Sequence, residues 1–241
     1  RSCHCASACV FPKLMPAKPI SARRLFLYLF SFVFLVMLLF RLAFWGFAAS
    51  DMPEPLSWDA FKAFYIGLRF DARLTAIFIM PLAAALCIPR LAENLRKAAR
   101  PLTVIYTLLF LALIAVYSAD FGFYAYLKTR VSSLLFELLQ DFGDAADMVR
   151  QSYPIPLIIC GVLSATAVCG FMFNRLIRLP VAVSPRKSRR ILGFTGGLLF
   201  IFLAIYGQIN SSLFPLRWSN AYFTTQEAVI ALGLIPVQSI Y

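Results

Sequence analysis

The sequence predicts an all-α membrane protein with five transmembrane helices, a cytoplasmic amino terminus, an external carboxyl terminus and a short external amphipathic helix. Hydrophobic residues make up 61% of the 241 residues and charged residues only 14%, a composition too apolar for a soluble domain. The hydrophobic residues form five long runs, and Lys and Arg gather between alternate runs. The net charge of +12 therefore indicates membrane orientation, and we expect no nucleic-acid partner.

The first run, residues 25–49, is long enough to cross a hydrocarbon layer about 30 Å thick. Arg41 interrupts it about 26 Å beyond Arg24, at 1.5 Å per residue, so we expect this side chain to reach outward beside Trp45 as an interfacial anchor rather than to be a buried functional arginine. The acidic segment 50–65 is expected to be an irregular loop. The remaining spans are predicted at about 66–88, 102–119, 155–173 and 191–209.

Small residues in the fourth span are expected to let neighbouring helices approach closely; they are Gly161, Ser164, Ala165, Ala167 and Gly170. Another pattern lies between the third and fourth spans. There, Leu134, Leu135, Leu138, Leu139 and Phe142 recur at helical spacing, which predicts an amphipathic helix over about 131–150. We expect this helix to lie along the outer membrane surface or over the spans, with a solvated helix against another domain as the alternative.

Basic residues orient the spans. Five Lys and Arg lie in the amino tail, four in the loop after the second span and six in the loop after the fourth, against five in the opposite segments. Nine of the eleven acidic residues lie in those opposite segments. The amino end is therefore predicted to be cytoplasmic. Three regions follow: a cytoplasmic tail (1–23), a five-helix transmembrane domain (24–209) and an external juxtamembrane connector (210–241).

The segment Gly67 to Arg73 places three charged residues at the mouth of an apolar run. On a helix, Arg69 and Arg73 share a face, while Asp71 is turned roughly 200° from Arg69. Two guanidinium groups on one face match the oxygens of a phosphate. These three residues are therefore candidate ligands of a lipid headgroup. The alternative is a structural ion network, in which Asp71 pairs with one of the arginines or with another helix.

Arg217 and Trp218 follow the last span and are read as an interfacial belt and juxtamembrane connector, with coupling of the domain that follows to the membrane as the sharper hypothesis. Both residues are also candidate headgroup ligands. Near the amino end, Cys3, His4, Cys5 and Cys9 have no second ligand pair after them, so we expect no metal site. His4 is the only histidine, which leaves no histidine-based catalysis within the spans. No catalytic residue and no cofactor are expected in this chain.

Three stretches together resemble the membrane domain of lipoteichoic acid synthase-like phosphoglycerol transferases, in the sulfatase-like branch of the alkaline phosphatase superfamily. They are Gly67-Leu-Arg-Phe-Asp71, Asp120-Phe-Gly-Phe-Tyr-Ala-Tyr-Leu-Lys-Thr-Arg130 and Asn210-Ser-Ser-Leu-Phe-Pro-Leu-Arg-Trp-Ser-Asn-Ala-Tyr222. The resemblance covers the chain from about residue 23 onward. It implies a bacterial cytoplasmic (inner) membrane location and a role in building the cell envelope.

The resemblance also implies an external catalytic domain after residue 241, with a Thr or Ser nucleophile and a divalent metal, commonly manganese. That domain would transfer phosphoglycerol from an anionic phospholipid such as phosphatidylglycerol, with diacylglycerol as the leaving group. The chain in hand is then expected to be a fragment that is inactive alone and that anchors the catalytic domain in the bilayer. Two alternatives remain: a small transporter or channel with Arg69, Asp71 and Arg73 along a polar path, or a non-catalytic membrane assembly subunit.

Overall fold

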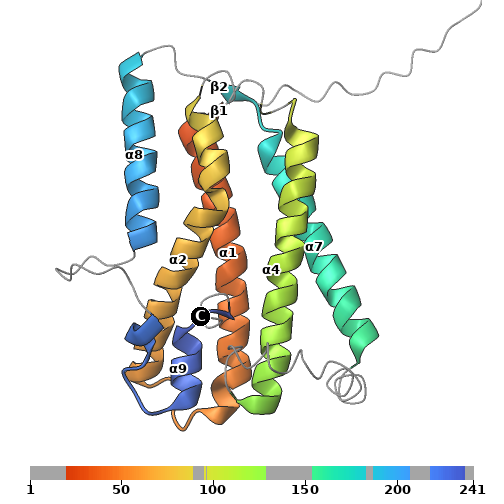
Figure 1. Cartoon of the computed structure of the whole chain (residues 1–241), viewed down its shortest axis with the longest axis vertical. Helices are drawn as coiled ribbons and strands as arrows, with labels where there is room; N and C mark the ends of the chain where they lie inside the picture. The colour runs from red at the N-terminus through yellow and green to blue at the C-terminus, as the bar shows by residue number, and fades with distance from the viewer. Residues whose placement is uncertain are drawn as a thin grey trace, which may run out of the picture.

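The computed structural model describes residues 20–88, 95, 97–128, 154–182, 187–206 and 218–236. Within these residues, α1 (Ala22–Ala48), α2 (Trp58–Cys87), α4 (Ala99–Leu127), α7 (Ile155–Ile177) and α8 (Lys187–Tyr206) alternate in direction along one bundle (Figure 1). The predicted all-α class is confirmed. The tail before residue 20 and the predicted amphipathic helix at 131–150 lie outside the described residues.

Helix α1 supplies the central face of the bundle. Ser21 caps its amino end, because the side-chain oxygen accepts a hydrogen bond from the backbone N–H of Arg24 at 3.4 Å. Just before the cap, β1 (Ile20–Ser21) pairs in parallel with β2 (Val181–Ala182), which ties the start of α1 to the chain after α7. The buried positions recur every three or four residues and so share one face: Leu25, Leu29, Val33, Met37, Arg41, Phe44 and Ala48.

Helix α2 begins earlier than its apolar run predicts. The segment 50–65 is not an irregular loop throughout: η1 (Ala49–Asp51) is a short 3-10 helix, and α2 already begins at Trp58. Ser57 causes this start, since its hydroxyl accepts a hydrogen bond from the N–H of Ala60 at 3.2 Å. The first two turns of α2 then bury Ala60 and Ala63 against the rest of the protein.

The other predicted spans correspond to α4, α7 and α8, with shifted ends. Helix α4 continues to Leu127, past the predicted end at 119, because Asp120 and Tyr124 are buried rather than solvated. The predicted close approach of small residues is confirmed at Gly170, where an added Cβ would lie 2.5 Å from Oγ1 of Thr107. Gly161 is exposed, and an added Cβ there would meet nothing within 4 Å.

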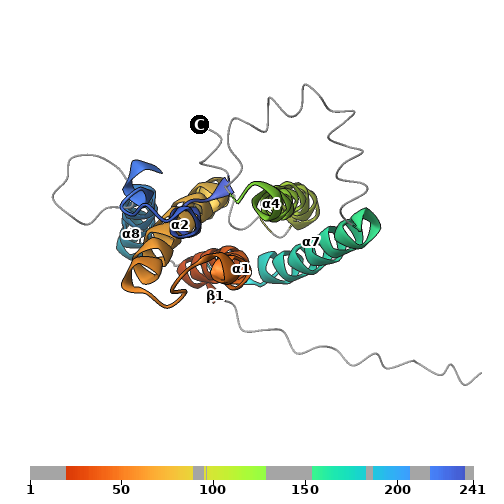
Figure 2. The ribbon, with the colours of Figure 1, turned by 90° about the horizontal axis from the view of Figure 1, so that it is seen from below.

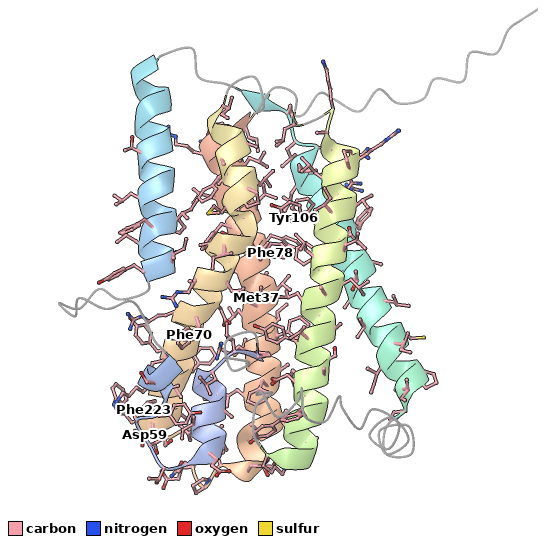
Figure 3. All side chains as sticks on the ribbon, in the orientation of Figure 1. Met37, Asp59, Phe70, Phe78, Tyr106 and Phe223 are labelled. Carbon is pink, nitrogen blue, oxygen red and sulfur yellow. The ribbon has the colours of Figure 1, made fainter. Side chains whose placement is uncertain are left out.

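A proline inside α2 is accommodated by a tyrosine from α4. Pro81 does not end the helix, but it has no N–H and leaves a gap in the hydrogen-bond ladder. The hydroxyl of Tyr106 donates to the carbonyl of Phe78 at 3.2 Å and accepts from the backbone N–H of Leu82. Figure 3 shows Tyr106 and Phe78 between the two helices. The bond that Pro81 lacks is the one to the carbonyl of Ile77, and the tyrosine binds the two backbone groups next to it.

Three helical stretches among the described residues are long and apolar enough to cross a membrane: Ala22–Asp51, Ala99–Ala125 and Ile155–Ile177. Large apolar side chains also point away from the bundle, among them Leu39 on α1, Leu108 on α4 and Leu163 on α7. An apolar outer surface of this kind is typical of helices that face lipid. Five spans, and their orientation, stay predictions.

The last described segment packs onto the bundle. It comprises η2 (Trp218–Ala221) and α9 (Glu227–Gly233), and it lies at the end of the bundle where α1 ends and α2 begins (Figure 1). Helix α9 packs against α2 and α1, and the view along the bundle places it beside α2 (Figure 2). Ala228, Val229, Ala231 and Leu232 are all buried there.

Candidate functional site

Arg41 is the centre of a buried polar site. It lies on the buried face of α1, and its side chain is only 2% exposed. Its Nε donates to Oδ2 of Asp71 at 2.5 Å, and its Nη2 donates to Oδ1 of the same carboxylate at 2.9 Å. Asp71, on α2, is completely buried. The two side chains therefore form a bidentate ion pair across α1 and α2, the arrangement that the arginine fork matches best.

The same guanidinium also binds the carboxyl end of α9. Its Nη1 donates to the carbonyl oxygen of Leu232 and, at 3.5 Å, to that of Leu234. The last carbonyls of a helix have no partner within the helix, and they carry the negative end of its dipole. A cation at this end satisfies the carbonyls and their charge together. We call Arg41, Asp71 and these two carbonyls the arginine clamp.

Gly67 makes room for the clamp. A Cβ at this position would overlap the guanidinium nitrogen and carbon of Arg41. Gly67 and Asp71 are four residues apart and so lie on the same face of α2. One helical turn therefore supplies both the space for the guanidinium and the carboxylate that binds it.

The expectation that Arg41 reaches outward to the membrane surface is wrong. The side chain lies inside the bundle because a partner for every part of the fork is available there, which removes the need for water. A signal for this burial exists in the sequence. Arg41 continues the series Leu25, Leu29, Val33 and Met37 at intervals of four, and that series is the buried face of α1.

Arg69 and Arg73 lie on a different face of α2 from Asp71. The guanidinium of Arg69 lies over the ring of Tyr65, 5.7 Å from its centroid. Arg73 is tied to α8, since its Nε donates to the carbonyl of Ile205 at 2.6 Å. About two turns before Arg69, Lys62 lies over the ring of Phe223 at 4.1 Å. Helical spacing puts Lys62, Arg69 and Arg73 on one side of α2; we call them the basic stripe.

The structure thus separates the candidate residues into two groups. Arg69 and Arg73 lie on the same side of the helix α2, as the spacing predicts, whereas both carboxylate oxygens of Asp71 are bonded to Arg41. Arg217 lies outside the described residues. Trp218 begins η2, which packs against α2.

Described residues from each of the three stretches quoted above lie beside the arginine clamp or beside helix α9. The first supplies Gly67 and Asp71. From the second, Asp120 is completely buried on α4, and Tyr124 packs in the same core cluster as Leu232 of α9. From the third, Ala221 lies beside Gly233 of α9, whose added Cβ would be 3.3 Å from the Cβ of Ala221. Stretches far apart in the sequence therefore share one end of the bundle.

Comparison with protein-family models, with curated proteins and with solved structures finds no match to the chain. Among the described residues, no group of three or more His, Cys, Asp or Glu side chains could hold a metal ion. What this site can do therefore follows from its own residues. It offers cations and aromatic rings on one side of α2, and a closed ion pair on the other.

Proposed function

We propose that this chain is the membrane domain of a phosphoglycerol-type lipid headgroup transferase of the sulfatase-like group, and that its basic stripe binds the phosphate of an anionic phospholipid. In this proposal the domain anchors an external, metal-dependent catalytic domain in a bacterial cytoplasmic membrane and presents the lipid to it. The reaction belongs to the catalytic domain, and the residues described here bind and orient the lipid.

The bonding of Asp71 is the observation that supports headgroup binding most. A carboxylate in the segment Gly67 to Arg73 could neutralise the neighbouring arginines, and the three charged residues would then form a closed ion network. Both oxygens of Asp71 are instead bonded to Arg41 of another helix. The positive charge of Arg69 and Arg73 is therefore not cancelled by the acid that lies between them in the sequence.

The surroundings of the stripe also suit a lipid phosphate. Arginine presents a planar fork with several donors, and Arg69 is held in place over Tyr65. The neighbouring exposed side chains of α2, such as Phe61 and Ile77, are apolar. A phosphate next to apolar surface is the pattern that a phospholipid presents at the boundary of the bilayer.

The transporter alternative is less well supported by this geometry. It requires Arg69, Asp71 and Arg73 to line one polar path. Asp71 is completely buried and lies on the α1 side of α2, while Arg73 bonds to a carbonyl of α8. The three charges therefore do not face a common space.

Lipid binding to the full chain in nanodiscs tests the proposal. We expect the Arg69→Ala/Arg73→Ala variant to bind phosphatidylglycerol at least tenfold more weakly, because each charge-assisted hydrogen bond is worth about 1.5–3 kcal/mol. Arg175→Ala is the matched control, since this arginine on α7 also lies over an aromatic ring four residues earlier, Phe171, at 5.2 Å. Equal binding by the native chain and the double variant would refute the headgroup role. Phosphatidylcholine carries the same phosphate next to a cation, so we expect it to bind the native chain more weakly and to lose less affinity in the double variant.

The proposed orientation has its own test. We expect a membrane-impermeant thiol reagent to label Asp144→Cys from outside intact cells but not Lys187→Cys, in a background without the natural cysteines. Residue 187 begins α8 at the end of the bundle where α1 also begins, and 144 belongs to the predicted outer segment. Labelling only at position 187 would show that the chain has the opposite orientation in the membrane.

A further inference from the structure

The arginine clamp joins the bundle to a segment that is far away in the sequence. Arg41 and its carbonyl partners Leu232 and Leu234 are separated by 191 and 193 residues. The guanidinium lies seven residues before the end of α1, which corresponds to a depth of about 10 Å at 1.5 Å per residue. The carboxyl end of α9 thus reaches into the bundle.

A helix end at this depth needs a donor. In a membrane interior, an unsatisfied carbonyl costs free energy because no water is available. The residues around the end of α9 are apolar and buried: Leu232 and Ile235 are 0% and 1% exposed. Arg41 brings hydrogen-bond donors to this end, and Asp71 balances its charge.

We propose that Arg41 is a positioning residue that docks residues 218–236 into the bundle as a re-entrant segment and so fixes where the chain leaves the membrane domain. Asp71 holds the guanidinium, Gly67 leaves space for it, and the carbonyls of Leu232 and Leu234 receive it. The same docking brings Phe223 over Lys62 at one end of the basic stripe. On the proposed function, the clamp therefore holds the connector to the catalytic domain beside the lipid-binding face.

Disulfide cross-linking in the full chain tests the docking without depending on lipid binding. An added Cβ at Gly233 would lie 3.7 Å from the Cα of Ala63 on α2. The two Cα atoms are therefore at most about 5 Å apart, a separation that a disulfide can bridge. The reporter pair is Ala63→Cys/Gly233→Cys, in a background without the natural cysteines. The control pair is Thr107→Cys/Gly170→Cys, where the added Cβ lies 3.4 Å from the Cβ of Thr107, because it reports the α4 and α7 contact away from the clamp.

We expect Arg41→Gln to slow cross-linking of the reporter pair at least tenfold and to leave the control pair unchanged, with partial recovery in Arg41→Lys. Gly67→Ala should also slow the reporter pair while keeping the arginine, because the added methyl group crowds the guanidinium and distorts its bonds to the carbonyls of Leu232 and Leu234. An unchanged reporter rate in both variants overturns the proposal. Equal loss at both pairs also overturns it, since Arg41 would then hold the whole bundle. A slowed reporter pair together with native phosphatidylglycerol binding would support the docking role of Arg41. It would also show that the clamp does not contribute to lipid binding.

Discussion

Replacement of Gly67 by alanine gives a sharp test of the buried site, because the expected sign is opposite to the usual one. In the middle of a helix, Gly→Ala ordinarily stabilises by up to about 1 kcal/mol. At Gly67 the added Cβ overlaps the guanidinium of Arg41. The guanidinium cannot simply swing away, because Asp71 and the end of α9 hold it inside the bundle.

The size of the effect follows from three contributions. Overpacking a buried site costs about 1–3 kcal/mol, and displacing one member of a buried ion pair costs about 3–5 kcal/mol when the pair is lost. The helix propensity of alanine offsets about 1 kcal/mol. Since the pair is distorted rather than removed, we expect Gly67→Ala to lower the free energy of unfolding by about 2–4 kcal/mol.

Reversible unfolding of the chain in mixed detergent micelles, followed by tryptophan fluorescence and circular dichroism, measures this difference. Gly161→Ala on α7 is the matched control, because its added methyl group would meet nothing within 4 Å. We expect that control to be unchanged or up to about 1 kcal/mol more stable. If Gly67→Ala were as stable as Gly161→Ala, Arg41 would not occupy the space above Gly67, and the clamp would be refuted.

Two further variants test neighbouring contacts in the same assay. Asp71→Asn should lower the free energy of unfolding by about 3 kcal/mol or more, because it leaves a buried guanidinium without its counter-charge. The control is Asp51→Asn, which breaks the exposed pair with Lys128 at 2.9 Å and should cost about 1 kcal/mol or less. Equal effects would show that Asp71 is not buried with its partner. Tyr106→Phe should cost about 1–3 kcal/mol, since it removes the hydroxyl at the Pro81 gap, whereas Tyr28→Phe on the outer face of α1 should be neutral. A neutral Tyr106→Phe would mean that the carbonyl of Phe78 and the N–H of Leu82 do not depend on this hydroxyl.

The apolar runs in the sequence predict where the long helices lie but not where they end. A helix end depends on single residues such as Ser57, whose hydroxyl starts α2 before its apolar run begins. At the other extreme, α4 continues past Asp120, a residue that polarity alone places in a loop. Its burial depends on packing, because Phe121 and Tyr124 pack their rings against Phe44 of α1. Such contacts between helices cannot be predicted from the sequence of either helix alone.

In the candidate site, too, one part can be predicted from the sequence and the other depends on contacts between helices. That Arg69 and Arg73 share a face follows from their spacing, and the structure agrees. The sequence also allows Asp71 to pair with a residue of another helix, but it does not identify that residue. Arg41 lies 30 residues away on α1, and the carbonyls of α9 lie still further along the chain. Backbone carbonyls have no sequence signal, so this half of the clamp can be found only from the fold.

The double variant Arg41→Leu/Asp71→Leu separates a clamp from an ordinary buried ion pair. Replacing a simple buried pair with apolar residues of similar size is often neutral or stabilising, because neither charge remains without a partner. Here the carbonyls of Leu232 and Leu234 also lose their donor, and each buried carbonyl left unsatisfied costs about 1–3 kcal/mol. We therefore expect the double variant to remain about 2 kcal/mol less stable than the native chain, although no unpaired charge is left. It should also expose residues 218–236 to added protease, which the native chain should resist. Native stability together with native protease resistance would show that the end of α9 does not depend on Arg41, and that the arginine serves Asp71 alone.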